Sequence, residues 1–154
     1  MADVIRVHVE GLAEVQTALR QLPDTTAKAV LRRVGCNRLA PVAERARELT
    51  PVGQGELRDS IAVSTKLTRR QRSKHRKDGP DDVEVFAGAG PHPQAHLQEF
   101  GTEHHGPQPF MRPAWDAEKE GVLAGIRQDL WSEIEKAATR LARKAAKAAA
   151  KGDG

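Results

Sequence analysis

The chain has 154 residues, 38% hydrophobic, 30% charged and only 3% aromatic, which fits one modest domain with an aliphatic core and excludes two well-cored domains. No stretch approaches the ~20 apolar residues of a membrane helix, the N-terminus lacks a signal-peptide pattern, and the single cysteine excludes an internal disulfide. We therefore expect a soluble protein made in a reducing cytoplasm. The net charge of +4 is unevenly spread: residues 66–77 hold seven Lys/Arg and no acid, residues 136–154 hold six Lys/Arg and one Asp, and the remainder has 12 basic and 20 acidic residues.

The N-terminal third predicts one short strand and two helices. Alternating apolar residues predict a half-buried strand over residues 4–9, and apolar steps of three and four predict an amphipathic helix over 12–22. A longer helix follows over about 25–49, with Pro41 inside it. Because Pro41 cannot donate a hydrogen bond to the carbonyl of Asn37, we expect a kink or break near residues 36–41. The expected apolar seam of this helix is Ala27, Leu31, Gly35, Leu39, Val42, Ala46 and Leu49.

Gly35 lies on that seam, and two explanations remain open for it. It permits the close approach of another backbone, or it is simply a weak point of the helix.

The middle of the chain predicts two strands. Residues 57–67 predict a short turn of helix that runs into a β segment from residue 61, and residues 83–89 predict a second strand that ends in glycines. The basic residues between them, with the Asp/Gly/Pro cluster 78–82, predict a long mobile connection. We therefore expect an extended β-hairpin with a basic tip.

The C-terminal part predicts an irregular segment followed by a long helix. Five of the nine prolines fall within residues 90–114, with a short helix expected over 95–100. From about Pro113 to Lys151 we expect a helix with the apolar seam Leu123, Ile126, Leu130, Ile134, Ala137 and Leu141. Past Leu141 nothing large can be buried, so this end should fray unless a partner orders it. The fold class is α+β, with a small antiparallel sheet packed on two or three helices; residues 1–141 form one domain and 142–154 a basic tail.

Enzymatic and metal sites receive little support from the residues. His92, His96 and Glu99 have a spacing that can hold zinc on a helix, but Pro93 interrupts the helix and no cysteine completes the set. The candidate nucleophiles Cys36, Ser60, Ser64 and Ser73 lack a nucleophile elbow, and residues 53–55 lack the lysine of a phosphate-binding loop. We expect no enzyme, no cofactor and no metal.

The basic stretch 66–77 is the strongest nucleic-acid signal. Cations at this density can bind phosphates, although the stretch has no aromatic residue to stack on a base. Docking on an acidic protein surface is the alternative. The candidate DNA or subunit contacts are Lys66, Arg69, Arg70, Arg72, Lys74, Arg76 and Lys77.

Two ordered motifs are more specific than these signals. The first runs from Pro51 to Ile61 and includes Gly55, Leu57, Arg58 and Ser60; the second reads Glu99-Phe100-Gly101-Thr102, then Pro109-Phe110, Arg112-Pro113-Ala114 and a long helix. Together they resemble the neck protein family (head–tail joining or minor tail proteins) of long-tailed double-stranded DNA bacteriophages, over residues 10–140. The chain departs from that pattern at Gln94-Ala95, where the family often has Tyr-Ala, and in its longer basic loop.

The motif residues are also interpreted as fold-forming. Gly55 and Gly101 are expected at positive φ, and Leu57, Ile61, Phe100 and Phe110 in the core. Arg58 and Glu99 are expected to pair, with Arg112 capping nearby carbonyls.

The resemblance implies a structural virion protein, assembled in the host cytoplasm, that forms a six- or twelve-fold ring around the DNA channel between the head connector and the tail. Its partners would be copies of itself, the connector or stopper, the tail-terminator or tube proteins and the packaged DNA. Two alternatives stay open: a tail-terminator or tail-completion protein that caps the tube, and a small nucleic-acid-binding protein that uses the basic loop.

Overall fold

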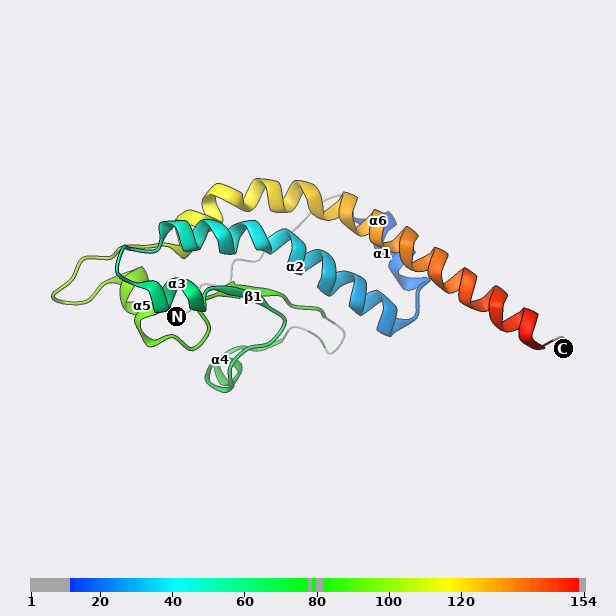
Figure 1. The fold of residues 1–154 in the computed structure, drawn as a ribbon, viewed down its shortest axis with the longest axis horizontal. Coiled ribbons are helices and arrows are strands. Elements are labelled where there is room, and N and C mark those ends of the chain that lie inside the picture. The colour runs from blue at the N-terminus through cyan, green and yellow to red at the C-terminus, as the bar shows by residue number, and fades with distance from the viewer. Residues whose placement is uncertain (1–11, 78, 80–81, 153–154) are drawn as a thin grey trace.

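A computed structural model describes residues 12–77, 79 and 82–152. Within these residues the chain is mostly helical, with one small sheet (Figure 1). The elements in chain order are α1 Ala13–Arg20, α2 Asp24–Leu49, α3 Gly55–Ser60, β1 Ala62–Ser64, α4 Arg69–Lys74, β2 Phe86–Gly88, α5 Pro93–Phe100 and α6 Met111–Gly152. The strand expected over residues 4–9 lies outside the described residues.

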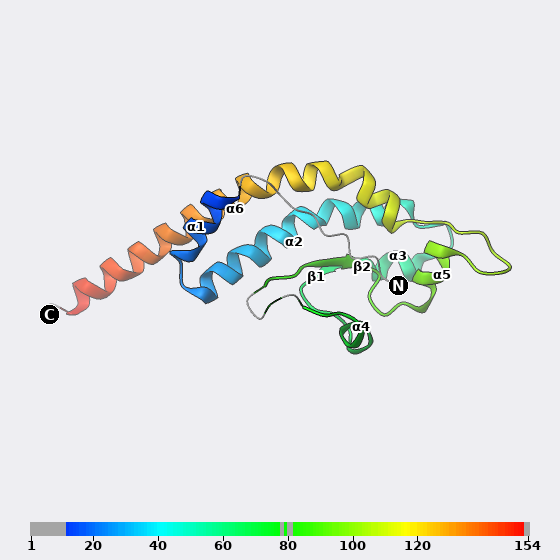
Figure 2. The same ribbon diagram turned by 180° about the vertical axis from the view of Figure 1, so that it is seen from behind.

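Three layers make up the fold. The two long helices α2 and α6 lie side by side and antiparallel, and the sheet packs on the other side of α2 (Figures 1 and 2). Salt bridges fix this antiparallel register, since Arg33 pairs with Glu133 and Arg38 with Asp129. Helix α1 packs near the middle of α6, where Glu14 lies 3.6 Å from Arg127.

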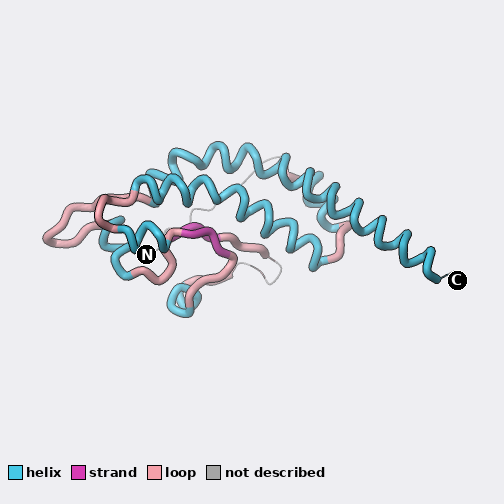
Figure 3. The backbone as a smooth tube through the Cα atoms, viewed as in Figure 1, coloured by secondary structure: helices cyan, strands magenta, loops and turns pink. Residues whose placement is uncertain are grey.

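The sheet is shorter than the sequence predicted. Strands β1 and β2 pair antiparallel, as expected, but over only three residues each, with Val63 opposite Ala87 (Figure 3). The connection between them is not a plain extended hairpin loop, because it contains helix α4. Thr68 starts α4 with a capping box, in which its hydroxyl accepts from the N–H of Gln71 while the Gln71 side chain accepts from the N–H of Thr68.

Helix α2 does not break at Pro41; a break was one of the two expected outcomes, and the expected kink stays a prediction. The helix runs unbroken from Asp24 to Leu49. Asn37 and Pro41 both lie on its exposed side, so water can reach the Asn37 carbonyl that Pro41 leaves without a donor. Burial of Val42 and Ala46 just beyond the proline holds the helix in place.

The buried face of α2 is also rotated from the expected seam. Val30, Val34, Val42, Ala43 and Ala46 are the buried residues of this helix, while Ala27, Leu31 and Leu39 pack only partly and Leu49 is exposed. Gly35 does allow a close approach, because a Cβ there would lie 2.7 Å from Cγ2 of Val85. The approaching group is a side chain from the segment before β2 rather than a backbone.

Helix α6 follows the predicted seam closely, with Val122 buried in place of Leu123. The helix continues past Leu141 to Gly152. Fraying of this end in the absence of a partner stays a prediction. Two clusters of buried residues result. One joins the C-terminal half of α2 to α3 and the start of α6, and the other joins α1 to the N-terminal half of α2 and the middle of α6.

Candidate functional site

The two sequence motifs meet at one end of the molecule, which we call the motif end. It comprises α3, α5, the loop 101–110 and the first turn of α6, and lies where α2 ends and α6 begins (Figure 1). Leu57, Ile61 and Phe110 are fully buried there, as expected. Ala114 is fully buried in the same core. The other motif residues lie on the segments of the motif end or, for Pro51, shortly before α3: Pro51, Gly55, Arg58, Ser60, Glu99, Phe100, Gly101, Thr102, Pro109, Arg112 and Pro113.

Glu99 caps the N-terminus of α6 from the end of α5. Its carboxylate accepts hydrogen bonds from the backbone N–H groups of Phe110, Met111 and Arg112, at 2.9 to 3.0 Å. The first N–H groups of a helix have no partner within the helix, and the positive end of the helix dipole favours an anion. The next residue, Pro113, has no N–H to satisfy. The motif therefore satisfies three N–H groups at the start of α6 with one buried carboxylate. At the next position it places a proline, which has no N–H group to satisfy.

Arg112 completes this network. Its Nε donates to the Glu99 carboxylate at 3.0 Å, and its Nη2 donates to the Glu99 backbone carbonyl at 2.9 Å. The expected pair between Arg58 and Glu99 is therefore wrong, while the expected capping role of Arg112 is confirmed. Arg58 lies beside the buried Leu57 on α3 and so points outward, where it comes within 3.6 Å of Asp59.

Burial and hydrogen bonding act on Glu99 in opposite directions. Burial by itself raises the pKa of this carboxyl, but the three backbone donors and the Arg112 side chain outweigh it and hold the pKa below the ordinary value of 4.5. Glu99 is thus a buried carboxylate that stays charged. A charged, fully partnered acid serves as a structural cap rather than a proton donor.

The loop 101–110 folds back onto α5. Gly101 has a φ of 78°, as expected, and a Cβ at this position would lie 2.8 Å from the His105 carbonyl. The Gln108 N–H donates to the Gln98 carbonyl at 2.8 Å. Gly55 was wrongly assigned a positive φ: it is the first residue of α3, and Gly53 supplies the positive φ of that turn.

An apolar patch, formed by Leu97 and Phe100, faces outward from α5. Their exposed fractions are 46% and 47%, so the prediction that Phe100 fills the core is wrong. Glu99 points inward to cap α6, and the adjacent Phe100 must then point away, on the same face as Leu97 three residues before. The Arg112 guanidinium lies over the Phe100 ring, 4.7 Å from its centre, and fixes the ring in place.

The predicted DNA or subunit contacts lie on and around α4, which is outside the motif end but contacts the chain just before α5, where Gln71 donates to the Gly90 carbonyl. Arg69, Arg70, Arg72 and Lys74 are exposed on this short helix. Lys66 precedes it, while Arg76 and Lys77 follow it. Helix α4, which carries four of them, lies on the far side of the sheet from α6 (Figure 2).

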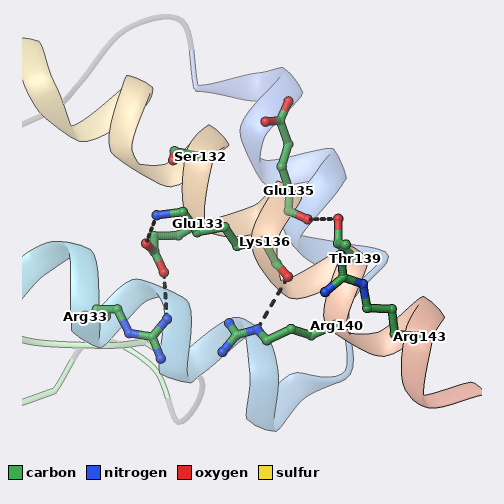
Figure 4. A pocket seen from close by; sticks show the side chains of 8 residues that line it. All are labelled: Arg33, Ser132, Glu133, Glu135, Lys136, Thr139, Arg140 and Arg143. Atoms are coloured by element: carbon green, nitrogen blue, oxygen red, sulfur yellow. Dashed lines mark hydrogen bonds and ion pairs between the residues drawn. The ribbon is translucent and has the colours of Figure 1, made fainter.

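A second charged region lies in an open groove of about 520 Å³ between α2 and α6 (Figure 4). Glu133 accepts from Arg33 of α2 and from Lys136 on its own helix, and these bonds lower the pKa of its carboxyl. Arg140 and Arg143 line the same groove from α6. Sequence analysis missed this groove because it depends on which faces of two distant helices meet.

The other sequence candidates have ordinary local partners. The hydroxyls of Ser60, Ser64 and Ser73 each donate to a nearby backbone carbonyl, and Cys36 is a partly buried free thiol. His92 accepts from the Gln94 N–H at the start of α5. Within the described part of the chain, no three His, Cys, Asp or Glu side chains gather as metal ligands, and no helix is long and apolar enough to cross a membrane.

One family model matches residues 13–101, which is more than half of the chain and includes the first motif and the Glu99 end of α5. Its description is "Bacteriophage HK97-gp10, putative tail-component". The chain belongs to the HK97-gp10-like family. No curated protein and no solved structure matches it.

Membership places this HK97-gp10-like protein in a family of structural phage tail components. The match ends at Gly101, one residue after α5, so the loop 101–110 and α6 lie beyond it. The contacts of Glu99 nevertheless tie the matched region to the start of α6.

Proposed function

We propose that this phage tail component is a structural protein of the neck, which joins the DNA-filled head to the tail as an oligomeric ring around the DNA channel. The observation that carries the proposal is the apolar patch of Leu97 and Phe100. Exposed apolar side chains that lie next to each other can serve as a protein–protein contact. Family membership supplies the setting, a phage tail.

One of the two patch residues, Phe100, also lies against a neighbouring side chain. Phe100 lies under the Arg112 guanidinium, and Arg112 is itself bound to Glu99, which caps α6. A pre-ordered side chain loses little side-chain entropy on binding, so it favours a defined neighbour. A ring needs a contact in which the patch binds a different surface of the next copy, and the proposal assigns the patch to a contact of this kind.

Two alternatives use the same surfaces differently. A tail-terminator or tail-completion protein would present the patch to the last ring of the tail tube. A nucleic-acid-binding protein would act through the exposed cations of α4 instead. Locating the protein in the virion by electron microscopy, relative to the last ring of the tube, separates the neck from the terminator position.

The test is complementation of a phage that lacks the gene. We expect the null phage to yield full heads and unattached tails, and the double variant Leu97→Ser/Phe100→Ser to restore few joined particles. The control Ala142→Ser/Ala149→Ser makes the same number of changes at exposed positions of α6. This control should restore joined particles to the wild-type level. Thermal unfolding of both variants shows whether they fold.

Firmly joined heads and tails in the null phage would refute a neck role. Full complementation by the folded double variant would show that the patch is not the contact.

A further inference from the structure

Helix α6 extends past the rest of the molecule. Residues 142–152, which we call the overhang, are exposed throughout and project beyond α1 and α2 (Figures 1 and 2). Such an exposed helix contributes no core contacts, and its composition indicates what it can bind.

The cations of this end share one face. At about 100° per residue, six of them fall within an arc of about 100°, and they cover about 22 Å of helix length. No acidic residue lies between the first and the last of them. We call this set the cationic stripe: Lys136, Arg140, Arg143, Lys144, Lys147 and Lys151.

The stripe begins in the groove between α2 and α6. Figure 4 shows Arg33 and Lys136 sharing the carboxylate of Glu133, while Arg140 reaches only the Lys136 backbone carbonyl. Among the described residues, no carboxylate pairs with Arg140 or Arg143. The local charge is therefore positive even where an acid is present.

The composition of the overhang favours a polyanion over a protein partner. Apart from its cations it holds only alanines and Gly152, so it has none of the large apolar or aromatic anchors on which protein interfaces depend. Lysine is also depleted in such interfaces. Phosphates need no anchor, because cations bind them through charge and the release of counterions.

Helix α4 is a poorer fit to the same ligand. Its four cations are spread over an arc of about 200°, so they cannot all face one surface. Arg72 in addition donates to the Leu67 carbonyl at 3.3 Å.

We propose that the cationic stripe of α6 binds the phosphate backbone of duplex DNA without reading its sequence. This inference deepens the proposed neck function and rests on it for the presence of DNA beside the protein. The six cations span a length over which duplex DNA presents about one phosphate per 1.7 Å, so several contacts form at once.

The test measures binding of the full chain to a labelled 30-base-pair duplex by fluorescence anisotropy. With five phosphate contacts, the logarithm of affinity should fall with the logarithm of salt at a slope of about −4.5, which is roughly a 500-fold loss between 50 and 200 mM. The stripe variant Arg143→Gln/Lys144→Gln/Lys147→Gln/Lys151→Gln should reduce this slope to about −1. Glutamine keeps a high helix propensity, and far-UV circular dichroism checks that the helix is retained.

The matched control removes four charges from α4: Arg69→Gln/Arg70→Gln/Arg72→Gln/Lys74→Gln. It should keep the wild-type slope to within about one. Wild-type binding by the stripe variant, or loss of binding in the control alone, would overturn the proposal. So would a stripe variant that loses self-association in sedimentation but keeps its DNA affinity, since the partner would then be a second copy.

The two proposals can fail separately. Salt-dependent DNA binding that requires the stripe, together with normal particles from the null phage, would retain the DNA site and reject the neck role. Loss of head–tail joining without DNA binding would do the reverse.

Discussion

At the motif end, the packing of buried residues determines which side chains lie on the surface. At the overhang, every side chain is exposed, and the spacing of the charged residues along one helix determines which of them share a face. Glu99 is buried under the first turn of α6, and this forces Phe100 outward. The overhang of residues 142–152 buries nothing, and its cations share a face because of helical periodicity alone. The first surface depends on tertiary structure and the second does not.

This difference has consequences for binding and for stability. The apolar patch is specific because a capped helix, a glycine turn and an arginine hold it, so damage to any of these damages the surface. The overhang can lose its charges without affecting the fold. Changes at the motif end should therefore alter stability, and changes at the overhang should alter only what the protein binds.

The largest effect should follow from Phe110→Ala. Phe110 is 1% exposed, and truncating a buried aromatic side chain costs about 4 kcal/mol of unfolding free energy through lost burial and a cavity. Denaturant unfolding measures it. The matched comparison is a chain that ends after Leu141, which should lose less than about 0.5 kcal/mol because residues 142–150 are exposed. Equal losses in the two variants would contradict the contrast between the ends.

An intermediate effect is expected for Glu99→Gln. Removing the charge weakens the bonds to the backbone N–H groups of Phe110, Met111 and Arg112 and the bond to the Arg112 side chain, at a cost of about 2 kcal/mol. The control Glu120→Gln, on the exposed side of α6, should cost almost nothing. The pKa of Glu99 is lower in the folded state than in the unfolded state, where it is near 4.5. The contribution of Glu99 to the free energy of unfolding is therefore complete above the unfolded pKa and is lost as pH falls through the folded pKa. The difference in unfolding free energy between wild type and Glu99→Gln should therefore be smaller at pH 3 than at pH 7. Denaturant unfolding at the two pH values measures this difference.

The smallest effect should come from the middle of the molecule, between the two ends. Arg38 of α2 binds Asp129 of α6 through two hydrogen bonds, at 2.5 and 2.7 Å, and the pairing lowers the pKa of Asp129. Both side chains are about one-third exposed, so solvent screens the pair, and Asp129→Asn should cost about 1 kcal/mol. A double-mutant cycle with Arg38→Gln should show coupling that falls in 1 M salt. Coupling unaffected by salt would mean that the pair is not screened.

Gly125 makes this pair possible, because a Cβ there would lie 1.9 Å from the Arg38 guanidinium carbon. Nothing in the sequence marks Gly125 as part of a bridge to a residue so distant along the chain.

The helices were largely predictable, because their signals are local. The spacing of Leu130, Ile134 and Ala137 repeats every three or four residues, and the structure buries all three on one face of α6. The strands were predicted too long, since pairing depends on where the two segments meet. Pro41 does not break α2, because Asn37 is exposed to water and the helix packs through Val42 and Ala46 further along.

The sequence by itself determined the long helices and the ordered motifs, because each follows from residue spacing along the chain. The cationic stripe needed the structure as well, because it exists only where α6 stays helical past Leu141. Only the tertiary structure decided that Glu99 caps α6 and pairs with Arg112 rather than Arg58. It alone also decided that Phe110 is buried while Phe100 is exposed. The physical reason is that the two phenylalanines are equally apolar, and their burial depends on how α5 is oriented against the first turn of α6.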